Sequence, residues 1–182
     1  VSLSVPGEHN VLNSLAAAAI GFELGIDQSK IISGINSYEG VRRRFEIKGA
    51  INNNDIIIID DYAHHPTEVK ATLNTAKKGW KKKIIGVFQP HLYTRTRDFS
   101  KEFAKAMMTS DVAIITDIYP AREKPIIGVS AKLVYDEMKE LGHKNTYYIP
   151  DLNDLNTIIE ENINKEALII TMGAGTIWRY GE

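Results

Sequence analysis

The chain of 182 residues contains no cysteine, which excludes a disulfide scaffold and a cysteine-ligated zinc site. It also lacks a charge excess, since 22 basic side chains stand against 23 acidic ones. A broad surface for nucleic acid or an anionic membrane is therefore not expected, and any anion site must be local. No apolar run is long enough to span a bilayer, and no targeting pattern is present. We expect a cytoplasmic protein whose partners include neither nucleic acid nor membrane. Composition leaves the oligomeric state open.

From Phe45 onward, short apolar runs alternate with amphipathic stretches, a pattern typical of a mostly parallel sheet covered by helices on both faces. The predicted strands are Phe45–Ala50, Ile56–Asp60, Lys83–Phe88, Val112–Thr116, Thr146–Ile149 and Ala167–Thr171. The predicted helices are Pro66–Lys78, Asp98–Met108, Ser130–Leu141 and Asp151–Ile163. A turn at Asn52–Asp55 would join the first two strands into an antiparallel hairpin at the sheet edge. The sequence therefore predicts a doubly wound α/β fold.

The segment before Phe45 has a different character. An alanine-rich helical period covers Gly7–Gly25, with Gly25 as the carboxyl-terminal cap, and a short second helix is predicted at Gln28–Ser37. Glycine, tyrosine and three consecutive arginines then follow in Tyr38–Arg44, which is the candidate domain boundary. Because the chain begins at Val1 without an initiator methionine, we expect it to be part of a longer protein.

The polar segment Asp60–Glu68 (DDYAHHPTE) directly follows four isoleucines, Ile56–Ile59. Such a run suits a strand buried on both faces of a parallel sheet, and Pro66 suits the first turn of a helix. Two carboxylates, a phenol and two imidazoles thus stand at the carboxyl end of a strand, where α/β sheets bind ligands.

The other predicted strand ends carry unusual segments as well. Gln89–Arg97 (QPHLYTRTR) and Asp117–Glu123 (DIYPARE) each follow a strand. The last strand ends in Gly173-Ala174-Gly175, which would let the backbone approach a ligand closely. We expect all of these segments to meet at one edge of the sheet.

Four segments together resemble the Mur ligases: GEHNVLN at Gly7–Asn13, GVRRRF at Gly40–Phe45, DDYAHHPTE, and FQPHLYTRT at Phe88–Thr96. They keep the family's order and span essentially the whole chain. The resemblance implies a dinucleotide-fold carboxyl-terminal domain at residues 39–182, preceded at residues 1–38 by the helical end of a central ATPase domain.

The resemblance further implies part of an ATP-dependent ligase of peptidoglycan synthesis. The paired histidines, FQPH and YTRT are most similar to the members that join L-alanine to the lactyl carboxylate of UDP-N-acetylmuramic acid through an acyl phosphate. ATP and Mg²⁺ would be the cofactors. Since no G-x-x-x-x-G-K-[ST] loop occurs, Mg²⁺ would be held mainly outside this chain. No metal ligand is assigned here, and the chain alone is predicted to be inactive.

Family positions that bind ATP match His9, Asn10, Asn13, Arg44 and Asp61. The asparagine amides suit a purine edge and Arg44 suits phosphate, where it would also assist catalysis. Capping of the first helix is an alternative role for His9 and Asn10. A solvated basic linker is the alternative for Arg44, and it describes Arg42 and Arg43 better.

Positions that would face the amino-acid substrate match Tyr62, His64, His65, His91 and Arg95. His64 is the candidate catalytic base for the incoming ammonium group, because an imidazole titrates near neutrality. Arg95, with His91, would hold the alanine carboxylate. His65 is equally well explained as a buried, hydrogen-bonded histidine. Leu92 replaces an arginine frequent in the family, which leaves the number of substrate contacts open.

The sequence supports three other classes of function less well. Histidines near Asp60 and Asp61 are legitimate zinc ligands of a hydrolase, but adjacent histidines chelate poorly. The glycines after the last strand fit a nicotinamide site only weakly. A non-catalytic module of the same fold would not need so many cleft residues. Within the ligases, the runner-up attaches recycled murein tripeptide to the same sugar.

Overall fold

The structure is a computed structural model that describes residues 1–53, 55–163 and 165–181, apart from the side chain of His9. The predictions for the His9 side chain and for Asn54 in the hairpin turn lie outside the described parts. Among the described residues, no helix has the length and apolar character needed to cross a bilayer.

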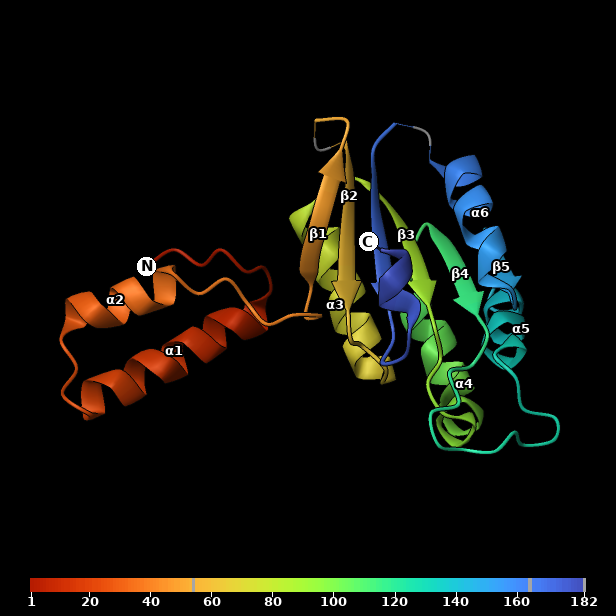
Figure 1. Cartoon of the computed structure of the whole chain (residues 1–182), viewed down its shortest axis with the longest axis horizontal. Coiled ribbons are helices and arrows are strands. Elements are labelled where there is room, and N and C mark those ends of the chain that lie inside the picture. The colour runs from red at the N-terminus through yellow and green to blue at the C-terminus, as the bar shows by residue number, and fades with distance from the viewer. Residues whose placement is uncertain (54, 164, 182) are drawn as a thin grey trace.

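The described strands form one sheet in the order β1-β2-β6-β3-β4-β5 (Figure 1). Their bounds are β1 Glu46–Ile51, β2 Ile56–Asp61, β3 Lys83–Phe88, β4 Val112–Thr116, β5 Thr146–Ile149 and β6 Ala167–Met172. β1 pairs with β2 in antiparallel fashion at the edge, and the remaining pairs are parallel. This confirms the predicted doubly wound fold and its edge hairpin.

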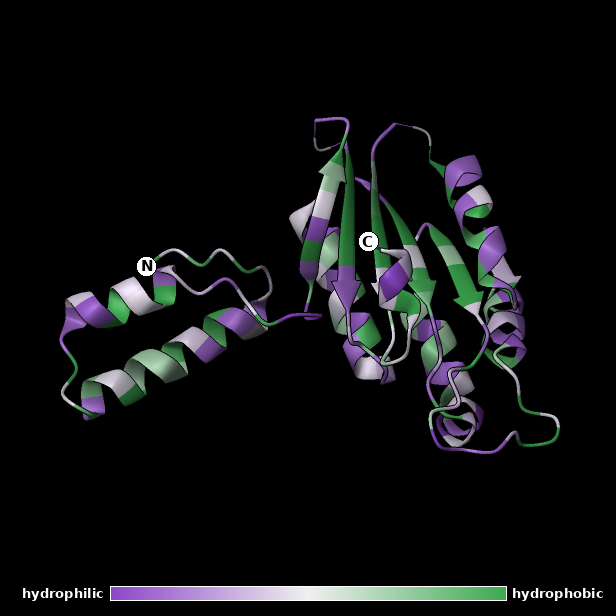
Figure 2. Ribbon diagram, viewed as in Figure 1, coloured by the Kyte–Doolittle hydropathy of each residue, from purple (hydrophilic) through white to green (hydrophobic). Residues whose placement is uncertain are grey.

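Helices cover both faces of the sheet. On one face α3 (Pro66–Gly79), α4 (Tyr93–Met107) and α5 (Lys132–Glu140) bury a core that includes Ile59, Leu73 and Phe103. On the other face α6 (Leu155–Asn162) and the 3₁₀ helix η2 (Ile177–Tyr180) cover a second core. Figure 2 shows the strands as the most apolar layer, with polar residues on the outer sides of the helices.

The isoleucine run explains why β2 needs cover on both sides. Alternate side chains of a strand point to opposite faces, so Ile57 and Ile59 join the first core while Ile56 joins the second. Burial on this scale is the main source of free energy for folding such a sheet.

The first two helices, α1 (Glu8–Glu23) and α2 (Gln28–Asn36), form a hairpin that stands apart from the sheet (Figure 1). Gly25, with φ of +68°, ends α1 as predicted. Large apolar side chains of α1 remain exposed, among them Leu12, Leu15 and Phe22. The domain boundary near residue 38 remains a prediction.

The bounds of α4, α5 and α6 differ from the predicted bounds. α4 begins at Tyr93 rather than Asp98, with a kink at Phe99, so that prediction was wrong by five residues. α5 begins two residues later than predicted, at Lys132. The predicted helix at Asp151–Ile163 divides into a 3₁₀ turn, η1 (Leu152–Asp154), and α6.

Candidate functional site

The segments after β2, β3 and β4 meet at the carboxyl edge of the sheet. The Tyr119 N–H donates to the Pro90 carbonyl at 2.8 Å, and the Leu92 N–H donates to the Tyr119 carbonyl at 3.0 Å. These bonds hold the β3–α4 and β4–α5 segments together. Polar residues that are distant in sequence therefore share one edge, as the sheet geometry predicts.

Aromatic rings from the three segments form a continuous row. The ring centroids of Tyr62 and His64 are 5.2 Å apart, those of His64 and His91 are 5.9 Å apart, and those of His91 and Tyr119 are 5.8 Å apart. The structure thus brings together three of the residues predicted to face the amino-acid substrate.

Hydrogen bonds determine which nitrogen of His64 carries a proton. Nδ1 lies 3.0 Å from the Tyr62 carbonyl oxygen and 3.3 Å from Oε2 of Glu68. Both oxygens accept, so Nδ1 must donate. Nε2 has no hydrogen-bond partner among the described residues, which leaves its lone pair available as a base.

His65 serves the fold directly. It is the N-cap of α3, where its Nδ1 accepts from the Thr67 N–H, and Glu68 completes a capping box by accepting from the His65 N–H at 3.0 Å. Burial acts to raise the pKa of Glu68, but the N–H and imidazole of His64 and His65 outweigh it and lower that pKa. His65 is thus hydrogen-bonded as its structural alternative predicts, but it is half-buried rather than buried, and its contact with substrate remains a prediction.

Arg95 lies beside His91, with Nη1 3.4 Å from the His91 Nδ1. Burial, followed by the charge of Arg95, lowers the pKa of His91. The two side chains form a half-buried corner with one cation beside the aromatic row, suited to a small carboxylate. The exposed Tyr62 forms one end of that row.

Sequence reasoning missed Glu123. Its carboxylate accepts from the N–H and the hydroxyl of Thr94, in the first turn of α4. Those donors lower the pKa of Glu123, the hydroxyl bond most strongly. Because the Leu92 side chain cannot cap the helix, a residue from the β4–α5 segment stabilises the start of α4.

Arg44, Asp61 and His64 line one cavity of about 410 Å³. Asp61 accepts from the Phe45 N–H, the Ala63 N–H and the Thr72 hydroxyl at 2.8–3.0 Å. Burial raises the pKa of Asp61, although these donors act against it. Asp61 therefore stabilises the linker as well as bordering the cavity.

Arg43 is not the solvated residue that sequence reasoning described, and that interpretation was wrong. Its Nε donates to Asp60 at 3.0 Å and its Nη2 donates to the Gly173 carbonyl at 2.6 Å. Both acceptors are remote in sequence, so no local pattern could reveal them. Arg42 is exposed, as expected.

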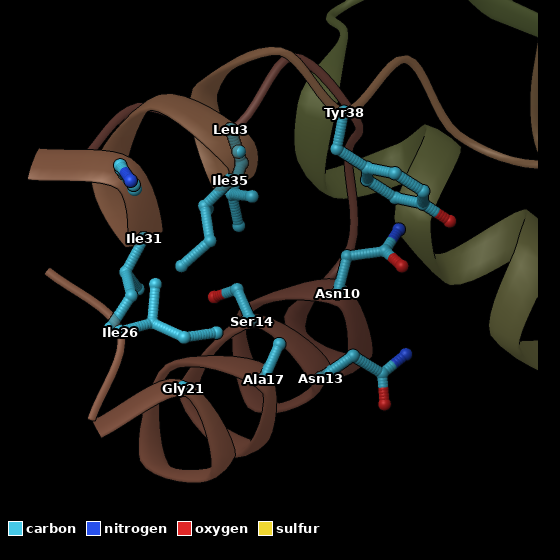
Figure 3. A pocket seen from close by; sticks show the side chains of 12 residues that line it. Leu3, Asn10, Asn13, Ser14, Ala17, Gly21, Ile26, Ile31, Ile35 and Tyr38 are labelled. Atoms are coloured by element: carbon cyan, nitrogen blue, oxygen red, sulfur yellow. The ribbon is translucent and has the colours of Figure 1, made fainter. Parts of the chain in front are cut away.

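Asn10 and Asn13 line a separate cavity of about 430 Å³ within the α1–α2 hairpin. Figure 3 shows the two amides and Tyr38 on one side and Ile26 and Ile31 on the other. The Asn10 amide donates to the Pro6 carbonyl at 2.7 Å, a contact near the start of α1. The structure does not bring these asparagines together with Arg44 and Asp61, since the two cavities share no lining residue.

The glycines after β6 allow close packing within the chain. A Cβ on Gly173 would lie 2.8 Å from the Gln89 carbonyl oxygen, and one on Gly175 would lie 2.5 Å from Cγ of Tyr119. Gln89 and Tyr119 thus occupy the space in which the close approach of a ligand was predicted, and Tyr119 is itself part of the aromatic row.

Residues 43–175 match the model of the Mur ligase, glutamate ligase domain. The chain belongs to the Mur ligase family. The UDP-N-acetylmuramate–L-alanine ligase of Geotalea uraniireducens is 44% identical over 182 residues, which is 100% of this chain and 39% of that protein. The chain thus spans about two fifths of the relatives it matches.

Solved structures of Mur ligases agree with the fold. The UDP-N-acetylmuramate-alanine ligase of Thermotoga maritima superposes with a TM-score of 0.82 at 34% identity, over 98% of this chain and 37% of that one. The murein peptide ligase of Psychrobacter arcticus has a TM-score of 0.66 at 23% identity, over 96% and 36%. The second likeness concerns the fold alone.

Metal-ligand side chains do not cluster in the part of the chain that the structure describes. Among these residues, no group of three or more histidines, aspartates or glutamates is close enough to hold an ion.

Proposed function

We propose that this chain is the carboxyl-terminal part of an ATP-dependent ligase that joins L-alanine to the carboxylate of UDP-N-acetylmuramic acid. The product would be a precursor of cell-wall peptidoglycan, and the reaction is expected to take place in the cytoplasm. The observation that carries the proposal is the row of rings that contains Tyr62, His64 and His91, with Arg95 beside His91, in a chain that is 44% identical to a named L-alanine ligase.

In the proposed reaction the amine of alanine attacks an acyl phosphate through a tetrahedral intermediate. An ammonium group cannot attack until it loses a proton, and the free Nε2 of His64 is placed to accept it. Arg95 would bind the alanine carboxylate next to His91. Tyr62 and His65 would border the same substrate.

The nucleotide would be bound by two groups of residues. Asn10 and Asn13, with His9, would recognise adenine and ribose, while Arg44 would pair with phosphate and Asp61 would face the ribose. Because these groups line separate cavities, the helical hairpin and the sheet domain would have to approach each other around the nucleotide. Closure of this kind also excludes water from a reactive acyl phosphate.

Magnesium and the phosphate loop would belong mainly to the remainder of the full-length protein. The chain alone is accordingly proposed to be inactive. The negative charge on the transferring phosphoryl group must be stabilised by magnesium and the phosphate loop, which this chain lacks.

The test is ATP-dependent phosphate release, measured side by side with the full-length protein and with residues 1–182. The proposal predicts release that requires both UDP-N-acetylmuramic acid and L-alanine, in the full-length protein alone. Release with murein tripeptide instead of alanine would favour the tripeptide ligase. No release with either amine substrate would favour a non-catalytic module, and turnover by the chain alone would overturn the proposed division of the site.

A further inference from the structure

The linker between the helical hairpin and the sheet is fixed at Arg43. Its guanidinium reaches two acceptors at once, Asp60 and the carbonyl of Gly173, and it lies over the Tyr62 ring at 4.8 Å from the centroid. Asp60 is only 1% exposed and also accepts from the Thr171 hydroxyl at 2.8 Å. Arg43 is thus tied to the ends of both β2 and β6.

Arg44 stands between two residues with unusual backbone conformation. Arg43 has φ of +60° and Phe45 has φ of +48°. Residues other than glycine rarely adopt this left-handed backbone conformation. Where they do, the conformation persists only because several surrounding contacts fix it. Residues with strained backbone conformations cluster at active sites and at sites that hold a ligand.

The surroundings do over-determine this bend. The Tyr62 N–H donates to the Arg43 carbonyl at 2.6 Å, and the Arg43 N–H donates to Oε2 of Glu46 at 2.7 Å. On the other side, the Phe45 N–H donates to Asp61 and its ring stacks on Trp80 at 5.7 Å. The backbone on each side of Arg44 is therefore anchored to the sheet domain, while the Arg44 side chain itself lines the cavity that contains Asp61 and His64.

We propose that Arg43 is a positioning residue, whose pairing with buried Asp60 holds the linker in this bend and directs Arg44 toward the nucleotide phosphate. The inference rests on the proposed function, which gives Arg44 its phosphate partner. Arginine is required at position 43 because a planar fork can serve a carboxylate and a carbonyl together and lie on an aromatic ring. A lysine has three donors on a single nitrogen and lacks the planar fork that spans the two acceptors while lying on the ring.

The test is a double-mutant cycle between positions 43 and 44 in the full-length enzyme. We expect Arg43→Ala to lower kcat/KM for ATP at least 10-fold and to change KM for L-alanine less than 3-fold. Arg43→Lys should recover only a small part of the loss. In an Arg44→Ala background, adding Arg43→Ala should cost less than 3-fold, because residues that act through one another are not additive.

Arg42→Ala is the matched control, since Arg42 lies in the same linker with an exposed side chain and should leave the kinetics unchanged. Thermal unfolding shows whether each variant is folded at the assay temperature. If Arg43→Ala does not fold, Arg43→Lys and Asp60→Asn replace it in the cycle. Each should lower kcat/KM for ATP, and each should cost less than 3-fold in the Arg44→Ala background.

Two outcomes would overturn the inference in different ways. Multiplicative losses, with Arg44→Ala itself impaired in ATP use, would show that Arg43 acts on stability alone and leave the proposed role of Arg44 intact. An Arg44→Ala enzyme with normal ATP kinetics would reject the role of Arg44 in the proposed function and with it the need to position this side chain.

Discussion

The imidazole rings of His64 and His91 lie 5.9 Å apart and nearly perpendicular, although they come from segments after different strands. Two imidazoles at this distance, with Arg95 beside the second, form a site where added positive charge is unfavourable. The site therefore favours a neutral His91, and a small carboxylate would relieve the repulsion.

Acidification should destabilise the folded chain through His91. Burial and Arg95 lower its pKa from the ordinary 6.5, so below about pH 6.5 the unfolded chain binds more protons than the folded one. Stability contributed by neutral His91 is complete above that pH and is lost as the pH falls toward the folded-state pKa. Urea unfolding of residues 1–182 between pH 7.5 and 5.5 measures this, and His91→Gln should flatten the slope. An unchanged slope in His91→Gln would assign the pH dependence to other groups.

Arg95→Ala in the full-length enzyme should raise KM for L-alanine by roughly 10- to 150-fold, because a charge-assisted hydrogen bond contributes about 1.5–3 kcal/mol. KM for ATP should stay within about 2-fold. Arg97→Ala is the control, since Arg97 is exposed and pairs only with Asp98 among the described residues. Equal increases for alanine and ATP would reject the assignment of Arg95.

Asn13→Ala in the full-length enzyme should affect KM for ATP more than KM for alanine. Loss of one neutral hydrogen bond to the nucleotide would raise KM for ATP by roughly 2- to 12-fold and leave KM for alanine unchanged. The Ser14→Ala variant, altered in the same cavity, serves as the control. Steady-state kinetics with each substrate varied in turn would decide it, and an unaltered ATP dependence in Asn13→Ala would contradict the binding role.

Gly175→Ala should destabilise the chain by about 1–3 kcal/mol, because its Cβ would overlap Gln89 Oε1, the nearest atom, and would meet Tyr119 Cγ at 2.5 Å and Cβ at 2.7 Å. Displacement of Tyr119 should also disturb its stacking on His91. Chemical denaturation gives the stability, and histidine NMR signals report the ring contact.

Gly34→Ala provides the comparison for that variant. Gly34 lies inside α2 with no atom within 4 Å of a built Cβ, so alanine should stabilise the chain by about 0.5–1 kcal/mol. If both variants changed stability in the same direction, packing against Tyr119 would not be the cause.

The sheet was predictable from the sequence because its signals are local. Apolar runs gave the bounds of β3, β4 and β5 to the residue, and Pro66 marked the first turn of α3. The gathering of polar segments at one edge followed from the parallel arrangement alone.

The two predictions that were wrong, for the start of α4 and for Arg43, share a different physical cause. The start of α4 carries no local capping signal because Glu123 provides its acceptors from 29 residues away. Arg43 was misinterpreted because its partners, Asp60 and Gly173, lie 17 and 130 residues away. Long-range hydrogen bonds of this kind leave no periodicity or spacing to detect.

The strand order has a consequence for biosynthesis. β6, the last described strand, lies between β2 and β3, so these two strands never pair with each other. A nascent chain on the ribosome has no sheet centre until residues 167–172 emerge. Release or truncation before that point would leave two half-sheets with bare edges open to aggregation, so the sheet is expected to fold only after β6 has been synthesised.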